Sequence, residues 1–189
     1  MSMKTIETTG ATLLPRLRLL ALALLMCLGG TALAACSFGE EEAVTDESTD
    51  VIKAGDRLPA FEVTLADGTA ASPATLSGRP SVIVFFNTAC SDCRKLLPTV
   101  QALYDETGEA ASFVCISREE GAQDVAAYWA KQGLTLPYSA QTDRTVYARF
   151  ATRTIPRIYV SDASGTVRTV FVEKASVKKL RAAIAAATQ

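Results

Sequence analysis

Runs of hydrophobic residues alternate with amphipathic stretches over most of the chain. Residues 81–86 are apolar on both faces, which is typical of a central parallel strand that is covered on each side. From Leu96 to Tyr104, apolar residues recur at three- and four-residue spacing, which predicts a helix with one buried face that bends at Pro98. Residues 111–117 are again apolar. This part of the chain is therefore predicted to form a strand, a helix and a second buried strand.

Shorter signals predict the elements on either side. Alternating apolar residues before Asp67-Gly68 indicate an edge strand and a turn, and Gly133 is predicted to end a helix. We expect a turn of helix over 73–76, a helix over 123–132, a short helix over 145–150, a hairpin of strands 157–160 and 166–172, and a closing helix over 175–187. This order of strands and helices predicts an α/β layer sandwich.

The first 35 residues have the pattern of an export signal. Lys4, Arg16 and Arg18 precede an apolar core, 19–28, that is too short to span a bilayer comfortably. The segment Leu33-Ala34-Ala35-Cys36 resembles the bacterial lipobox, in which the cysteine becomes the lipidated N-terminus after cleavage. We expect residues 1–35 to be a lipoprotein signal peptide and Cys36 to carry the lipid. Ordinary signal cleavage and an uncleaved anchor are the alternatives.

Acidic and polar residues fill the next segment, 36–50, which has little to bury. It is predicted to be a lipidated, disordered tether that holds a single domain, 51–189, off a membrane surface. The whole chain has 19 Lys and Arg against 20 Asp and Glu, and removal of the predicted signal leaves 16 against 19. No basic patch indicates a nucleic-acid partner.

The composition excludes much of the usual catalytic chemistry. The chain has five cysteines and no histidine, so a Ser-His-Asp triad, a Cys-His pair and a Cys2His2 zinc site are all impossible. A four-thiolate zinc site would need a second close pair of cysteines, and Cys115 stands alone. We therefore predict neither a metal site nor a cofactor. Cys115 is expected to be a small buried hydrophobic residue.

Cys90 and Cys93 lie three apart at the junction between the strand 81–86 and the following helix. Two thiols at this spacing can close a disulfide and reopen it. A thiolate at the first turn of a helix faces unpaired backbone N–H groups and the positive end of the helix dipole, which makes it the better nucleophile. Cys90 is expected to occupy that position. Cys93, one turn further in, is expected to attack the mixed disulfide that Cys90 forms with a partner.

Further motifs resemble the thioredoxin superfamily, and in particular its membrane-tethered TlpA/ResA-like members with a redoxin (AhpC/TSA-like) domain. These motifs are the opening segment 53–61, the segment 76–80 before the central strand, Pro98 five residues after Cys93, and Thr154-Ile155-Pro156 at the position of the family's cis-proline loop. The resemblance implies a thioredoxin-like three-layer sandwich with a central mixed β-sheet and helices on both faces.

The resemblance also implies a function and its residues. Cys90 would be the nucleophile and Cys93 the resolving cysteine of a redox-active disulfide, Cys90–Cys93. Thr154, Ile155 and a cis Pro156 would hold an extended segment of the client beside the reactive sulfur. The expected protein is a thiol-disulfide oxidoreductase, lipid-anchored in the bacterial cell envelope outside the cytoplasm. It would reduce protein disulfides with electrons from a membrane donor, because no histidine lies between the thiols to favour a strong oxidant.

Some departures from the family leave questions open. Leu96 and Val84 stand where relatives carry a carboxylate that accepts the proton of the second thiol, so another acid, such as Glu62, or water must serve. A peroxiredoxin-like thiol peroxidase is one alternative, but it requires Thr or Ser where this chain has Asn87, with Thr88 one place out of register. A metal or haem-assembly chaperone that uses the two thiols as ligands is another, and the absent histidine argues against it.

Overall fold

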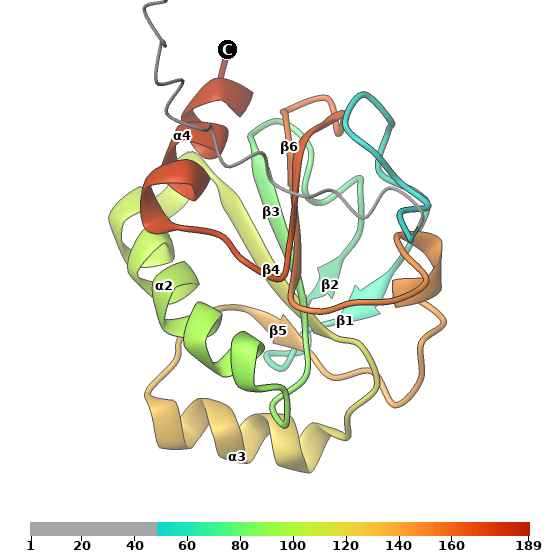
Figure 1. The fold of residues 1–189 in the computed structure, drawn as a ribbon, viewed down its shortest axis with the longest axis vertical. Coiled ribbons are helices and arrows are strands. Elements are labelled where there is room, and N and C mark those ends of the chain that lie inside the picture. The colour runs from blue at the N-terminus through green and yellow to red at the C-terminus, as the bar shows by residue number, and fades with distance from the viewer. Residues whose placement is uncertain (1–48) are drawn as a thin grey trace, which may run out of the picture. The chain divides into compact units, whose positions relative to one another are not determined.

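A five-stranded mixed sheet runs through the part of the chain that the computed structural model describes, residues 49–189 (Figure 1). The strand order is β5-β4-β3-β6-β7. The central strand β3 runs parallel to β4 and antiparallel to β6. The strands are β3 (Ser81–Phe86), β4 (Ser112–Ser117), β5 (Tyr138–Ser139), β6 (Arg157–Ser161) and β7 (Val167–Val172). The predicted α/β sandwich with a central mixed sheet is confirmed.

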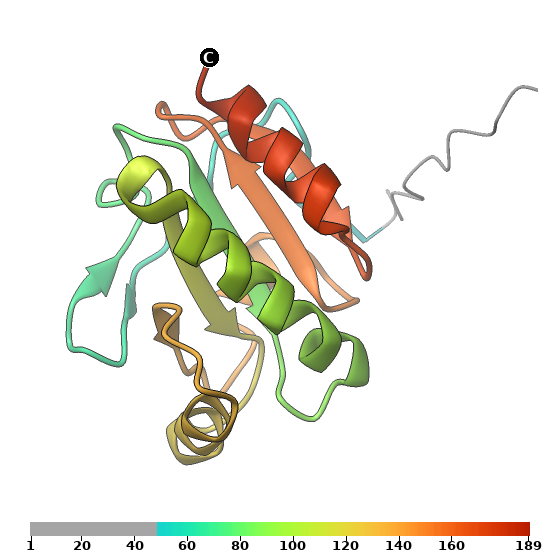
Figure 2. The same cartoon turned by 90° about the vertical axis from the view of Figure 1, so that its left-hand side faces the viewer.

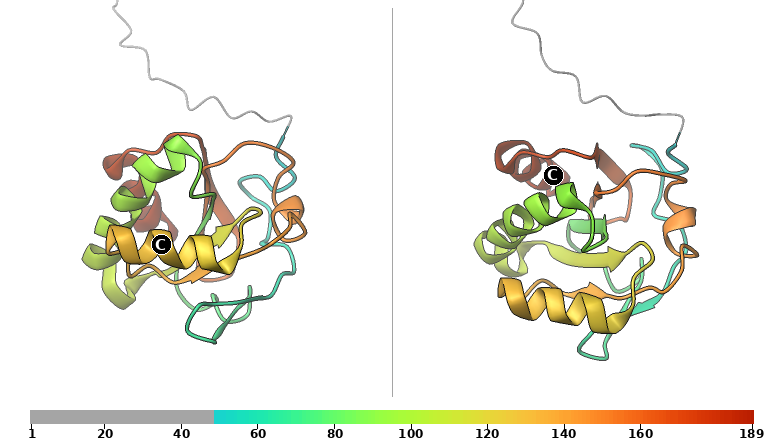
Figure 3. Two further views of the ribbon diagram at one scale, coloured as in Figure 1. Left: turned by 90° about the horizontal axis from the view of Figure 1, so that it is seen from below. Right: turned by 60° about the horizontal axis from the view of Figure 1, so that its bottom comes forward.

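Helices α2 (Ser91–Thr107) and α4 (Val177–Ala187) lie side by side on one face of this sheet (Figure 2). Helix α3 (Ala122–Gln132) packs against the same hydrophobic cluster and lies beside the first turns of α2 (Figure 3). It ends at Gly133, which takes a left-handed conformation with φ 64° that glycine adopts without strain. The helix stop predicted at this residue is confirmed.

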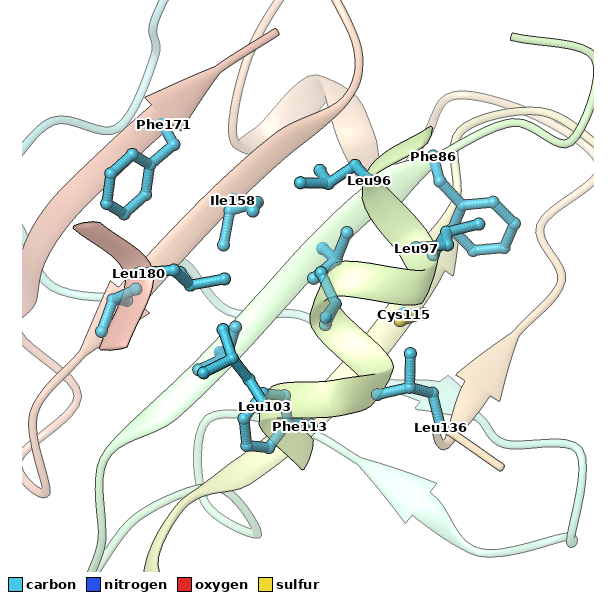
Figure 4. Close-up of a cluster of buried hydrophobic side chains, with 14 of the residues drawn as sticks. Phe86, Leu96, Leu97, Leu103, Phe113, Cys115, Leu136, Ile158, Phe171 and Leu180 are labelled. Carbon is cyan, nitrogen blue, oxygen red and sulfur yellow. The ribbon is translucent and has the colours of Figure 1, made fainter. Parts of the chain in front are cut away.

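The core on this face forms around α2 (Figure 4). The helix buries one stripe of side chains against β3, β4 and β6, namely Cys93, Leu96, Leu97, Val100 and Leu103. Trp129 closes the cluster from α3, with its ring centroid 4.9 Å from that of Phe86, and its Nε1 donates a 2.9 Å hydrogen bond to the buried carbonyl of Leu136. The spacing of apolar residues in the sequence therefore identified the buried face of α2 correctly.

The opposite face of the sheet is covered by shorter elements. These are the hairpin β1 (Val63–Thr64) and β2 (Ala70–Ala71), the 3-10 turn η2 (Tyr147–Arg149) and the segment before β1. Phe85 is the centre of this cluster, and its ring contacts those of Tyr147, Phe150 and Tyr159. The helical turn predicted over 73–76 is a series of hydrogen-bonded turns, and the short helix predicted over 145–150 is only the three residues of η2.

The described chain begins earlier than the predicted domain boundary. Thr49 is 1% exposed, and Asp50 pairs with Ala151 in a β-bridge, so these two residues of the predicted tether belong to the folded domain. The predicted signal peptide, Cys36 and the rest of the predicted tether lie outside the described residues. Between residues 49 and 189, no helix is both long and apolar enough to cross a membrane.

Candidate active site

Cys90 is the N-cap residue of α2, at the end of a tight turn that follows β3. The turn is fixed by Asn87, whose Oδ1 accepts a 2.8 Å hydrogen bond from the N–H of Ala89 and whose carbonyl accepts one from the N–H of Cys90 at 3.1 Å. The Sγ of Cys90 accepts the backbone N–H of Cys93 at 3.5 Å, which is the position of an N-capping side chain. The half-buried sulfur thus faces the positive end of the helix, as the sequence predicted.

Cys93 lies one turn further along α2 and is completely buried. Burial raises the pKa of its thiol well above the usual range, because the interior disfavours the charged thiolate. The backbone of Asn87 and the positive charge of Arg118 oppose this rise, while Cys90 adds to it. Both cysteines are free thiols, so the structure describes the reduced dithiol. The Cys90–Cys93 disulfide stays a prediction.

Arg118 is a residue of this site that the sequence reasoning missed. It follows β4 directly, and its N–H donates a 2.8 Å hydrogen bond to the carbonyl of Phe86 at the end of β3. Its guanidinium lies 6.0 Å from the centroid of the Tyr147 ring and pairs with Glu119 at 2.8 Å. Because the carboxyl ends of parallel strands meet at one edge of a sheet, the first residue after β4 could have been expected near the dithiol.

The loop before β6 reaches the dithiol from the other side. The peptide bond between Ile155 and Pro156 is cis, as the resemblance implied. The carbonyl oxygen of Ile155 lies 3.8 Å from the Sγ of Cys90. Thr154, the residue before, takes a φ of 73°, which a β-branched residue rarely adopts. The structure therefore brings together four predicted site residues, Cys90, Cys93, Ile155 and Pro156, with Thr154 at the edge.

The carboxylate that lies close to the dithiol is not the one that the sequence suggested. Glu62 is exposed, between two residues that are buried on the opposite face of the sheet, and it is not among the groups that influence the pKa of Cys93. The expectation that it accepts the proton of Cys93 is therefore unsupported. Glu120 instead accepts hydrogen bonds from the backbone N–H and the hydroxyl of Thr88, which braces the turn before Cys90.

A groove lies between the start of α2 and the loop that follows β7. Its volume is about 350 Å³, and it is lined by Asp92, Lys95, Leu96 and Thr99 on one side and by Glu173, Lys174, Ala175 and Ser176 on the other. The lining thus contains side chains of both charge signs as well as apolar carbon, and it includes Asp92, which stands between the two cysteines in the sequence.

Cys115 plays no part in this arrangement. It lies within β4 at 0% exposure, surrounded by the core that α2 covers (Figure 4). Burial alone raises the pKa of its thiol. The structure agrees with its interpretation as a small hydrophobic residue. Within residues 49–189, no cluster of three or more Cys, His, Asp or Glu side chains could hold a metal ion.

Comparison with known proteins places this geometry in context. Residues 54–170 match the AhpC/TSA family. A Mycobacterium tuberculosis protein that is named as a peroxiredoxin is 30% identical over 120 residues, which cover 62% of this chain and 76% of that protein.

Solved structures share the fold. A thio-disulfide isomerase of Thermus thermophilus is 31% identical with a TM-score of 0.61, and the match covers 72% of this chain and 97% of that one. A thiol:disulfide interchange protein of the thioredoxin family from Chlorobium tepidum is 26% identical with a TM-score of 0.64, and covers 72% and 99%.

Proposed function

The chain belongs to the AhpC/TSA family and is a thiol-disulfide oxidoreductase with a thioredoxin-like fold, and we propose that it reduces disulfides of other exported proteins through Cys90 and Cys93. One observation carries this proposal. The sulfur of Cys90 is half-buried at a helix N-terminus, with a buried thiol one turn behind it and the Ile155 carbonyl 3.8 Å in front of it. A nucleophile, a resolving thiol and a backbone edge at Ile155 on which a client can dock, here called the docking edge, are thus adjacent.

The reaction proceeds by two exchanges. The Cys90 thiolate attacks one sulfur of the client disulfide, a Cys90–client bond forms, and the other client sulfur leaves as a thiolate that takes up a proton. Cys93 then loses its proton and attacks the Cys90 sulfur, which releases the second client thiol and leaves a Cys90–Cys93 disulfide. Two electrons have passed to the client. A membrane-bound dithiol or quinol-linked donor must return them before the next cycle.

The backbone at Thr154, Ile155 and Pro156 holds the client. An extended client segment that pairs with the backbone at Ile155 lies against the sulfur of Cys90, so that the attacked disulfide needs no further positioning. The side chains of the client next to its cysteine then meet the groove beside Asp92 and Glu173.

The site of action is the cell envelope. The export pattern of residues 1–35 and the lipobox-like Cys36 support a protein that is anchored by lipid outside the cytoplasm, with the acidic segment after Cys36 as its tether. Labelled palmitate provides the test. Full-length protein expressed in a bacterium should incorporate it, and a Cys36→Ser variant should not.

Trapping tests the function. In a Cys93→Ala variant the mixed disulfide cannot be resolved, so that a client should stay bound to Cys90 and be released by dithiothreitol. Cys90→Ala should trap nothing, and Cys115→Ala, which alters a buried thiol outside the site, should behave like the unmodified protein. Wild-type protein should also reduce insulin. If no client is trapped and no insulin is reduced, the proposed function is wrong.

The direction of electron flow has its own test. Equilibration with glutathione should give a reduction potential nearer to that of thioredoxin, about −270 mV, than to that of the strong oxidant DsbA, about −120 mV. A value near the latter would make the protein an oxidant of exported thiols.

A thiol peroxidase is the second candidate, because the mycobacterial relative is named as a peroxiredoxin. The contacts of the turn before Cys90 favour disulfide exchange instead. The side-chain oxygen of Asn87 accepts the N–H of Ala89, and the hydroxyl of Thr88 donates to Glu120, so both groups are already occupied. Consumption of hydrogen peroxide at a rate that exceeds insulin reduction would favour the peroxidase.

A further inference from the structure

The loop that carries Ile155 has a conformation that its own sequence does not favour. Thr154 is β-branched and has a φ of 73°, in the left-handed region, where a non-glycine residue is strained. Such a conformation persists only where the surrounding structure holds it. The groups that hold this loop therefore determine where the next carbonyl, that of Ile155, lies.

Two buried side chains hold the loop through its backbone oxygens. The hydroxyl of Tyr147 lies 2.6 Å from the carbonyls of both Arg153 and Thr154. The guanidinium of Arg157 donates to the same two carbonyls, from Nη2 to Arg153 at 3.0 Å and from Nε to Thr154 at 3.4 Å. Both carbonyls that precede Ile155 are thus fixed by the same pair of side chains.

Arg157 is a charged residue in an otherwise apolar strand. It follows the cis proline as the first residue of β6 and is 0% exposed, and its neighbours Ile158, Tyr159 and Val160 are buried and mostly apolar. A buried guanidinium requires a partner of opposite charge. The carboxylate of Asp50 supplies it through an ion pair with Nη1, and the side chain of Asp50 is only 4% exposed.

The segment Thr49–Asp50, here called the N-terminal strap, is attached to this loop along its backbone. Thr49 accepts a 2.9 Å hydrogen bond from Nη2 of Arg157 through its hydroxyl, and its carbonyl accepts the N–H of Thr152 at 2.9 Å. Asp50 pairs with Ala151 in a β-bridge. The strap therefore lies against both ends of the short stretch, residues 151–157, that presents Ile155 to the dithiol.

A buried ion pair is a poor means of stabilising a fold, because replacement of both partners by apolar residues is often neutral or favourable. In this protein the pair also supplies hydrogen-bond donors, the guanidinium N–H groups of Arg157, which apolar residues could not replace. We propose that Asp50 and Arg157 are positioning residues for client recognition: the strap carboxylate fixes the guanidinium, which fixes the carbonyls of residues 153 and 154 and thereby the docking edge at Ile155. This inference rests on the proposed function.

Three full-length variants in detergent separate this role from a purely structural one. Asp50→Asn removes the counter-charge, Arg157→Lys keeps a charge but loses the forked donors, and the double variant Asp50→Leu/Arg157→Met removes the buried charges together. Arg181→Met removes an exposed ion pair with Glu106 between α4 and α2 and serves as the matched control. For each protein, unfolding in urea, the KM for insulin and the rate with the small disulfide DTNB are measured.

The double variant should unfold at a higher urea concentration than Asp50→Asn. Its KM for insulin should nevertheless be about tenfold higher than that of the unmodified protein, because the charge-assisted hydrogen bonds to the loop are lost. Its rate ratio of insulin to DTNB should fall by a similar factor, because a small disulfide needs no backbone pairing. Arg181→Met should match the unmodified protein in all three measurements. Arg157→Lys should show an intermediate KM.

The outcomes distinguish two failures. If the folded double variant and Arg157→Lys both keep the KM of the unmodified protein for insulin, the ion pair serves the fold only and this inference is wrong. If the unmodified protein reacts with DTNB but does not reduce insulin at all, the proposed function is wrong, and this inference falls with it.

Discussion

The attack of Cys93 on the mixed disulfide should accelerate about tenfold for each pH unit between about pH 7 and pH 9. Cys93 is completely buried, and burial is the largest cause of its raised pKa. An ordinary thiol with a pKa of about 8.5 is about 3% ionised at pH 7, and each unit by which the pKa is raised reduces that fraction tenfold. The thiolate of Cys93 therefore stays a small fraction that is proportional to hydroxide over the whole range.

DTNB separates this step from the first one. The reduced dithiol should release thionitrobenzoate in two phases: a bimolecular phase as Cys90 attacks, and a unimolecular phase, independent of DTNB concentration, as Cys93 displaces the second group. Stopped-flow absorbance on a chain with Cys27→Ser and Cys36→Ser excludes the thiols outside the domain. A second-phase rate that is flat between about pH 7 and pH 9 would refute the reasoning from burial.

Arg118→Met extends the same experiment, because this guanidinium opposes the rise in the pKa of Cys93. Loss of this nearby, partly exposed positive charge should make ionisation of Cys93 less favourable by about 1 kcal/mol. The second phase should therefore slow about fivefold at neutral pH, while its rate still rises about tenfold per pH unit. A second phase that is as fast in Arg118→Met as in the unmodified chain would show that Arg118 does not act on Cys93.

Three further predictions concern stability in urea. The pKa of Cys115 in the folded protein lies above its unfolded value of 9.0, so the buried neutral thiol contributes fully to the free energy of unfolding below about pH 9. This contribution is lost as the pH rises further. In Cys115→Ala, the alkaline decrease in the free energy of unfolding should therefore be less steep by about 1.4 kcal/mol per pH unit. Trp129→Phe should cost about 1–3 kcal/mol, because the Leu136 carbonyl loses its buried donor. Glu173 has a φ of 62°, so Glu173→Gly should stabilise by about 0.5–1 kcal/mol, whereas Glu173→Ala should not.

The sequence predicted those parts of the fold whose signal is local. The apolar run of β3 and the stripe of α2 each lie within one element, so periodicity alone located them, and the spacing of Cys90 and Cys93 placed the dithiol at their junction. Strand β5 was missed because two residues, Tyr138 and Ser139, show no periodicity. Its pairing with β4 depends on the packing of α3, which no local pattern reveals.

The contacts that complete the site are long-range, and for that reason they escaped prediction. Asp50 was assigned to an acidic tether because its neighbours in the sequence are acidic, yet its partner Arg157 lies more than a hundred positions away. Glu62, which the sequence analysis names as one possible proton acceptor for Cys93, lies between residues that pack on the other face of the sheet. Charge in a sequence indicates solvation on average, and only the fold shows which charges are buried.

The same geometry bears on the direction of electron flow. Strong oxidants owe their potential to a stabilised reduced form, which means donors or positive charges placed around a thiolate. The two cations that follow Cys93 are engaged elsewhere: Lys95 pairs with Asp92 at 3.0 Å, and Arg94 donates to the carbonyl of Thr88 at 3.4 Å. The carbonyl of Ile155, which faces the Cys90 sulfur, accepts a hydrogen bond from a thiol but offers none to a thiolate. Burial also keeps Cys93 protonated, so the Cys90 thiolate is stabilised by the N–H of Cys93 and the positive end of α2 without help from these two cations. We therefore expect a weaker oxidant than DsbA, with electrons passing from this protein to its clients.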